Sequence, residues 1–341
     1  MTPTHPSFPV VYGERVGVRG GIKLRSCLQP PLTLTLSPRK IGGREKLSYV
    51  GERDDNFEGT MPTHVLLAVL AAAVLHASWN AMLKGRTGDP LVTSTWIAIG
   101  AAVVALPALV VSGVPQSASL PYVAASAIVH VGYFVLVGLA YRAADYSAVY
   151  PLVRGGAPLF TVLLGAALLG ERPAPLAAIG VCVLCAGVIG LGRDGLRRGG
   201  LDRRALACVA SLIAVIVGYT LIDGIGARVS GNAAGYVLAM MVLNGALMLL
   251  TGLWLRGRAL LPSVGADWGQ ALVGGAMVLI SYGTALWAMT KAPIGLVGAL
   301  RETSVLFAAL IATFGLGERF GPARWLAAVA IVLGLALIQL H

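Results

Sequence analysis

Residues 148–172 read AVYPLVRGGAPLFTVLLGAALLGER, and residues 295–319 read GLVGALRETSVLFAALIATFGLGER. A shift of 147 positions places Arg154 on Arg301, and it also aligns the Gly-Glu-Arg triplets that close the two segments. A repeat of roughly 150 residues is far longer than the 20–50 residues of solenoid repeats. The chain therefore contains two copies of one folding unit, each with an arginine inside an apolar run.

The composition is that of a membrane protein. Of the 341 residues, 57% are hydrophobic and 12% are charged, whereas soluble domains average about 45–50% and about 25%. The net charge of +11 arises mainly in the first 60 residues and in short gaps between apolar runs, where lysine and arginine set membrane orientation. No nucleic-acid-binding motif accompanies these charges, so we expect no nucleic-acid partner.

Ten apolar runs are each near the ~20 residues that a helix needs to span a bilayer. They cover approximately residues 64–83, 91–112, 120–141, 146–169, 174–192, 205–226, 233–255, 268–289, 293–315 and 322–340. Helix is expected because lipid offers backbone polar groups no hydrogen-bond partner. The predicted fold class is an all-α integral membrane protein with ten transmembrane helices.

The spans divide into two sets of five. Residues 61–192 form the first five-helix repeat, residues 193–204 a basic linker, and residues 205–341 the second repeat. Residues 1–60 are polar and rich in proline, so we expect a disordered tail or a true start at Met61. Because five is odd, the copies enter the membrane from opposite sides and form inverted repeats, a plan that places a transporter's substrate site near the midplane.

The motif HASWNAMLK at residues 76–84, the paired LGER closings and the five-plus-five duplication resemble the EamA-type branch of the drug/metabolite transporter superfamily. The resemblance covers about residues 62–340. It implies a carrier of small metabolites, often an exporter of amino acids or related compounds, that works by alternating access with both termini cytoplasmic. The loop charges instead favour a cytoplasmic linker and outward-facing ends. Both orientations stay open at this point.

Arg154 and Arg301 each lie about eight residues into a span, or roughly 12 Å at 1.5 Å per residue. An arginine at this depth faces the bundle interior or a watery cavity. We predict that both contact an anionic substrate, since a guanidinium offers a rigid fork of donors. The alternative is a structural role, in an ion pair or on backbone carbonyls at a helix break.

Glu302 is the only acidic residue well inside a predicted span, and it is our candidate for proton coupling. The alternative is a permanent ion pair. Residues i and i+1 do not face each other on a helix, so the better partner is Arg154 of the other copy rather than Arg301.

Several further polar side chains are predicted to line a substrate cavity between the copies. These candidates are His76, Trp79, Asn80, His130, Tyr133, Asn244 and Tyr282, with Ser281 beside the last. Each could instead serve as interhelical glue, worth typically about 0.6 kcal/mol. Asp223 is expected to snorkel from its span to the interface, and the Gly-Glu-Arg triplets are expected to end their helices.

The sequence predicts a secondary transporter that moves a small polar or amphipathic metabolite across a bacterial inner membrane by alternating access. An amino acid or related anion is the favoured substrate, and export is favoured over import. The expected partners are the lipid bilayer, protons as a coupling ion, and a second copy of the chain in a homodimer. No catalytic motif or cofactor fingerprint is present, and histidine is too sparse for a metal site. The rival functions are a membrane-embedded lipid enzyme and a channel or scaffold subunit.

Overall fold

The computed structural model describes residues 61–84, 89–143, 146–192, 202–260, 264–316 and 321–340. These residues are almost entirely helical, and no strand occurs among them. The tail 1–60 and most of the linker 193–204 lie outside the described residues, as does the hypothesis that the chain starts at Met61.

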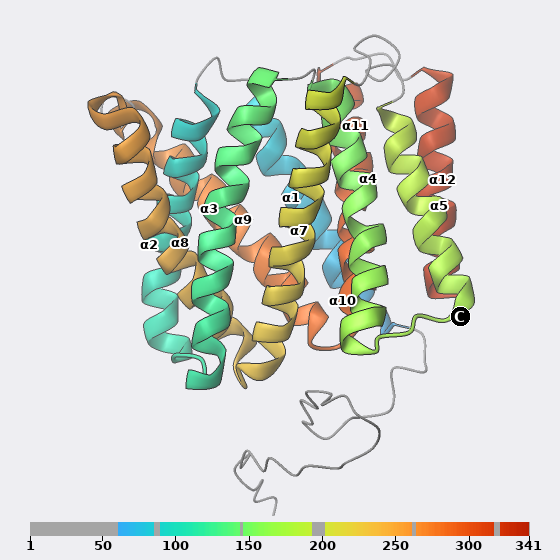
Figure 1. The fold of residues 1–341 in the computed structure, drawn as a ribbon, viewed down its shortest axis with the longest axis horizontal. Helices are drawn as coiled ribbons and strands as arrows, with labels where there is room; N and C mark the ends of the chain where they lie inside the picture. Colours follow the sequence, from blue (N-terminus) through green and yellow to red (C-terminus); the bar gives the residue numbers. More distant parts are fainter. Residues whose placement is uncertain are drawn as a thin grey trace, which may run out of the picture. The chain divides into compact units, whose positions relative to one another are not determined.

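The helices follow the ten predicted spans (Figure 1). The first copy contains α1 (Thr63–Lys84), α2 (Pro90–Ser112), η1 (Ser117–Ser119), α3 (Leu120–Ala143), α4 (Tyr146–Leu164), the π-helical η2 (Gly165–Leu169) and α5 (Pro175–Leu191). The second contains α7 (Arg203–Val229), α8 (Ala233–Arg256), η3 (Gly257–Leu260), α9 (Val264–Met289), α10 (Ile294–Arg301), α11 (Thr303–Leu316) and α12 (Pro322–Gln339). In the described residues, nine segments are long and apolar enough to cross a membrane, and α5 is a shorter apolar helix.

Proline and glycine set several of these boundaries. Pro175 and Pro322 occupy the first helical turns of α5 and α12, where a missing N–H is tolerated. Gly170 ends the fourth span with a left-handed φ of 72°, a conformation that only glycine adopts without strain. The prediction that the first Gly-Glu-Arg triplet ends a helix is therefore confirmed, while the second triplet lies outside the described residues.

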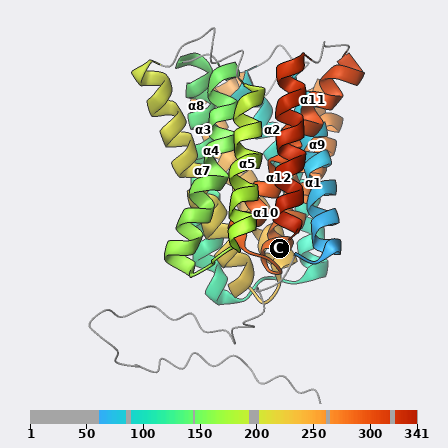
Figure 2. The same ribbon diagram turned by 90° about the vertical axis from the view of Figure 1, so that its right-hand side faces the viewer.

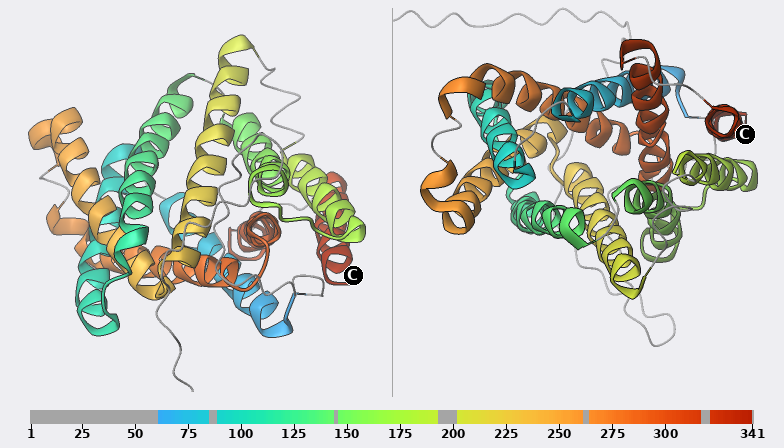
Figure 3. Two further views of the ribbon diagram at one scale, coloured as in Figure 1. Left: turned by 60° about the horizontal axis from the view of Figure 1, so that its bottom comes forward. Right: turned by 90° about the horizontal axis from the view of Figure 1, so that it is seen from above.

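The two copies interlock, so that the main helix contacts join one copy to the other. Helix α2 packs on α8 and α9, α3 on α7 and α8, α1 on α9 and α11, and α5 on α12. Helices α5 and α12 stand side by side in Figures 1 and 2. Viewed along the helices in the right panel of Figure 3, they lie at one end of the bundle, with α2, α8 and part of α9 at the other.

The contact between α5 and α12 shows the inverted symmetry directly. A Cβ atom at Gly180 would lie 2.7 Å from the carbonyl oxygen of Gly334, and one at Gly187 would lie 2.8 Å from that of Ala327. A shift of 147 positions turns Gly180 into Ala327 and Gly187 into Gly334, so it exchanges these two contacts. Small residues allow such close approach between membrane helices.

Both ends of the bundle lie at one face. The Nε2 of Gln339 at the end of α12 donates a hydrogen bond of 3.0 Å to the carbonyl oxygen of Met61, just before α1. An even number of spans requires this arrangement, which we call the terminal face. The joint between the copies, after α5 and before α7, therefore belongs to the opposite face.

The ninth span is broken, which the apolar pattern of residues 293–315 did not indicate. Helix α10 ends at Arg301, Glu302 forms a turn, and α11 begins at Thr303. The hydroxyl of Thr303 donates to the carbonyl oxygen of Leu300 at 2.7 Å, and the amide of Glu302 donates to Ala299 in a tightened turn. No proline marks the site, so hydropathy and length alone could not reveal it.

The α5–α12 contact yields a test of the fold. We expect Gly180→Ala to lower the free energy of unfolding by about 1–3 kcal/mol, because the new Cβ would overlap backbone atoms that cannot move aside. Gly190→Ala on the same helix is the matched control, because a Cβ there meets only the Ala327 methyl group at 3.6 Å. Thermal unfolding in detergent measures both, and equal stability of the two variants would contradict the packing described.

Candidate functional site

An ion pair between the two copies lies in the interior of the bundle. The Nε of Arg154 on α4 is 2.7 Å from the Oε2 of Glu302, with side-chain exposures of 11% and 9%. These two atoms form a charge contact rather than an aligned hydrogen bond. The Nη2 of Arg154 also donates to the hydroxyl of Ser304 at 3.0 Å. The ion pair that the sequence analysis gave as the alternative for Glu302 is thus present, with the partner it favoured, and it balances the charge of Arg154.

Arg301 has a different environment from its counterpart in the first copy. Its guanidinium carbon lies 4.9 Å from the centre of the Tyr282 ring, and its side chain is partly exposed. Within the described part of the chain, no carboxylate lies within ion-pair distance of it. Cation–π contacts contribute about 0.5–2 kcal/mol, so this ring holds Arg301 without balancing its charge.

Aromatic rings from three helices surround this position. His130 on α3 stacks on Tyr219 of α7 with ring centres 4.2 Å apart, and it meets Tyr282 of α9 edge-on at 5.6 Å. Tyr133 meets Tyr219 edge-on at 5.8 Å. Three of the predicted residues therefore come together, and Tyr219, which the sequence analysis missed, lies between them. We call Arg154, Arg301, Glu302, His130, Tyr133, Tyr219 and Tyr282 the central cluster.

Asp223 on α7 adjoins the central cluster, and the expectation that it snorkels to the interface is wrong. Asp223 is 0% exposed. Its Oδ1 accepts a hydrogen bond of 2.8 Å from the hydroxyl of Tyr236 on α8, and its Oδ2 accepts one from the hydroxyl of Tyr282. The short aspartate side chain faces the interior of the bundle, where two tyrosines hold it. The only sequence signal for this site is an acidic residue inside an apolar run.

The candidates on α1 lie differently. His76 is within electrostatic reach of both Arg154 and Arg301. The Trp79 ring meets His76 edge-on at 5.3 Å, and its buried Nε1 has no hydrogen-bond partner among the described residues. Asn80 instead donates a hydrogen bond of 2.7 Å to the backbone oxygen of His76 in its own helix. Thus His76 lies near the two arginines of the central cluster, and Trp79 packs against it.

Two other polar residues are not part of this arrangement. Asn244 is buried in α8, and its Oδ1 accepts no hydrogen bond within the described part of the chain. Ser281 donates a hydrogen bond of 2.8 Å to the backbone oxygen of Ala72 and so joins α9 to α1. Of the two roles considered for Ser281, cavity lining and interhelical contact, the observed hydrogen bond is an interhelical contact.

The model of the EamA-like transporter family matches residues 63–193 and 205–340, which are the two five-helix copies. The chain belongs to the EamA-like transporter family. It is therefore a multi-pass membrane protein of a family of transporters. A search of curated proteins found no match. A solved structure described only as "Crystal structure of protein" is 21% identical with a TM-score of 0.69, covering 82% of this chain and 97% of that chain; this likeness concerns the fold.

A polar network closes the terminal face of this EamA-like protein. Glu171, which follows η2, accepts a hydrogen bond of 2.9 Å from the first amide of α10 at Ile294, and its Oε1 lies 2.6 Å from Arg228 at the end of α7. Arg228 also donates to the carbonyl oxygens of Met289 and Ala292. Glu171 of the first copy therefore contacts α10 and α7 of the second directly, and Arg228 extends the network to the end of α9.

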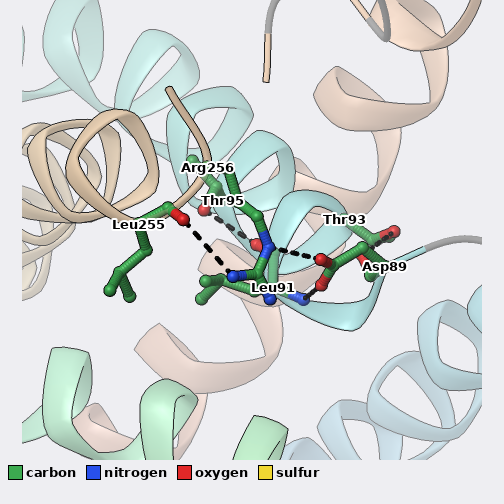
Figure 4. A network of polar contacts seen from close by, with 6 residues as sticks. All are labelled: Asp89, Leu91, Thr93, Thr95, Leu255 and Arg256. Atoms are coloured by element: carbon green, nitrogen blue, oxygen red, sulfur yellow. Dashed lines mark hydrogen bonds and ion pairs between the residues drawn. The ribbon is translucent and has the colours of Figure 1, made fainter. Parts of the chain in front are cut away.

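A third ion pair joins the copies at the opposite face (Figure 4). Asp89 begins α2, where its Oδ1 accepts a hydrogen bond of 2.9 Å from the amide of Leu91, and its Oδ2 accepts one from Nε of Arg256 at the end of α8. Burial alone would raise the pKa of Asp89. The hydrogen bonds from Arg256 and Leu91 outweigh that effect and hold the pKa below its ordinary value.

The internal ion pair predicts a specific pattern of stability. Glu302→Gln should lower the free energy of unfolding by about 3–5 kcal/mol, because Arg154 would keep an unbalanced buried charge. The double variant Arg154→Gln/Glu302→Gln should recover part of the lost free energy of unfolding, because the unbalanced charge is gone. Arg301→Gln is the matched control and should lose only its cation–π contact with Tyr282, about 0.5–2 kcal/mol. Additive losses in the double variant would show that the two charges do not interact.

The Asp89–Arg256 pair predicts a dependence on pH. Because the folded pKa of Asp89 is depressed, the stabilisation is present above the ordinary value of 3.8 and is lost as the pH falls below it. Asp89→Asn keeps a good helix N-cap but removes the charge. It should be less stable than the parent at pH 7 by at most about 1 kcal/mol, as expected for a partly exposed pair. Thermal unfolding at pH 7 and near pH 3 checks this, and a difference of undiminished size near pH 3 would contradict it.

Proposed function

We propose that the protein is a secondary transporter that carries a small polar or amphipathic metabolite bearing an anionic group, and that Arg301 binds this group. One observation supports this above all. The two copies place an arginine at the same position, yet only Arg154 is in ion-pair contact with Glu302. Arg301 has no described carboxylate at ion-pair distance, and it lies beside aromatic rings in the interior of the bundle.

The surroundings of Arg301 suit recognition of a carboxylate-bearing compound. A guanidinium binds a carboxylate through two parallel hydrogen bonds, which fixes its orientation as well as its position. The rings of Tyr282, Tyr219 and His130 offer apolar faces close by. Arg301 is also the last residue of α10, and interrupted helices of this kind commonly form transporter sites. An amino acid or a related anion meets these requirements.

Alternating access is consistent with the arrangement of the ion pairs. Glu171 and Arg228 join the copies at the terminal face, whereas Asp89 and Arg256 join them at the opposite face. A rocking motion of one copy against the other would open one pair while the other stays closed. We propose this motion as the transport step, in the direction of export across a bacterial inner membrane.

Flux measurements with purified protein in liposomes test the proposal. Radiolabelled amino acids and small organic anions would serve as probes, preceded by a growth-inhibition screen with toxic analogues. We expect saturable uptake and counterflow for at least one probe. Arg301→Ala should reduce the flux at low probe concentration by about 10–100-fold, because hydrogen bonds to a charged group contribute about 1.5–3 kcal/mol. Arg301→Lys should recover part of the flux.

Arg258→Ala is the matched control, since it removes an exposed arginine distant in sequence from the central cluster. Flux that does not saturate would indicate a channel instead of a carrier. Flux in Arg301→Ala equal to that of the parent protein would remove Arg301 from the binding site. Turnover of a lipid substrate by the purified protein would support the enzyme alternative.

A further inference from the structure

Among the described residues, two carboxylates, Glu302 and Asp223, are buried in the interior of the bundle, and their environments differ. Glu302 is in contact with the guanidinium of Arg154. Asp223 accepts hydrogen bonds from two tyrosine hydroxyls, and within the described part of the chain no lysine or arginine lies at ion-pair distance from it. A fully buried carboxylate without a cation is rare in a membrane-spanning helix and is by default a candidate functional group.

We propose that Asp223, and not Glu302, is the site at which this transporter binds and releases a coupling proton; this inference rests on the proposed transport function. Protonation of Glu302 would leave the buried charge of Arg154 unbalanced, which is strongly unfavourable. Protonation of Asp223 breaks no ion pair and removes a charge from the bundle interior. The free energy needed to convert the ionised to the protonated state is therefore smaller for Asp223 than for Glu302. A group that gains and loses a proton in every transport cycle needs such a small difference.

The groups around Asp223 support this assignment. From α3, His130 lies within its electrostatic reach, and Tyr122 interacts with the neighbouring Tyr236. On α4, Arg154 is engaged by Glu302. The other charged or titratable groups facing the site are Tyr219 on α7, Tyr236 on α8, Tyr282 on α9 and Arg301 on α10. Of these only His130 ordinarily titrates near neutral pH, so it is the competing proton site.

Tyr282 connects the proposed proton site with the proposed substrate site. Its ring lies under the guanidinium of Arg301, and its hydroxyl donates to the Oδ2 of Asp223. An ionised Asp223 accepts from both tyrosines, whereas a protonated Asp223 carries a donor of its own, which one tyrosine hydroxyl can accept only by giving up its role as donor. A change of protonation would thus rearrange the hydrogen bonds between α7, α8 and α9 next to Arg301.

The position of Asp223 indicates where the proton would enter. Asp223 precedes the end of α7 at Val229 by six residues, which corresponds to about 9 Å of helix. Tyr236 stands just after the start of α8 at Ala233, at the same end of the bundle. Asp223 therefore lies between the central cluster and the terminal face. A proton from water at that face adds to the carboxylate to give a neutral acid, and its release restores the carboxylate.

Infrared difference spectroscopy of the full-length protein in liposomes tests this proposal without any substrate. On acidification, a carbonyl band of a buried carboxylic acid should appear. Asp223→Asn should abolish the band, while Glu302→Gln and His130→Gln should keep it. Tyr236→Phe should shift its midpoint to higher pH by about one unit, because one donor to the ionised form is lost.

The outcomes are distinct. A band that is lost in Glu302→Gln and kept in Asp223→Asn would overturn the assignment, and so would a spectrum without any titrating buried acid. If Asp223→Asn does not fold, the shift in Tyr236→Phe still decides, because an acid elsewhere would not respond to that hydroxyl. Intact titration together with an absence of flux for every probe would instead contradict the proposed transport function.

Discussion

The ion pair between Arg154 and Glu302 is the constraint on which the interior of this protein depends. A single charge in the middle of a bilayer is strongly unfavourable, and it is tolerated when an opposite charge meets it at contact distance. These charges come from different copies of the repeat, 148 positions apart in the chain. The interior can therefore form only when the copies interlock, which links the packing of the whole bundle to one polar contact.

The interlocked helices share an approximate symmetry, but their chemistry does not. Where α5 crosses α12, the same small-residue contact occurs twice, related by the repeat. At the arginine position, Gly155 follows Arg154, whereas Glu302 follows Arg301. The single glutamate neutralises the arginine of the first copy and leaves that of the second unbalanced. The helix arrangement is thus symmetric, whereas the charged residues in the interior are not. This asymmetry favours the second copy as the location of ligand binding.

The two interior carboxylates have separate roles in this scheme. Glu302 maintains the frame through its contact with Arg154, and it also occupies the break between α10 and α11. Among the described residues, the hydrogen-bond partners of Asp223 are two tyrosine hydroxyls and no ion pair forms, so a change in its charge breaks none. Tyr282 touches both Asp223 and Arg301, and it offers a direct physical link between proton binding and anion binding in the proposed cycle.

The sequence by itself determined the membrane class, the spans, the duplication and the depth of Arg154 and Arg301, since hydropathy, length and spacing are properties of the chain read locally. For Glu302 it predicted proton coupling and kept an ion pair as the alternative, with Arg154 as the better partner because adjacent residues on a helix point apart. Only the tertiary structure decided that Asp223 turns inward, that Tyr219 joins the site, and that Asn80 bonds to its own helix. Those outcomes depend on how each helix is rotated about its axis and on which helices pack against it. In a segment that is apolar on all sides, the residue pattern specifies neither the rotation nor the neighbours.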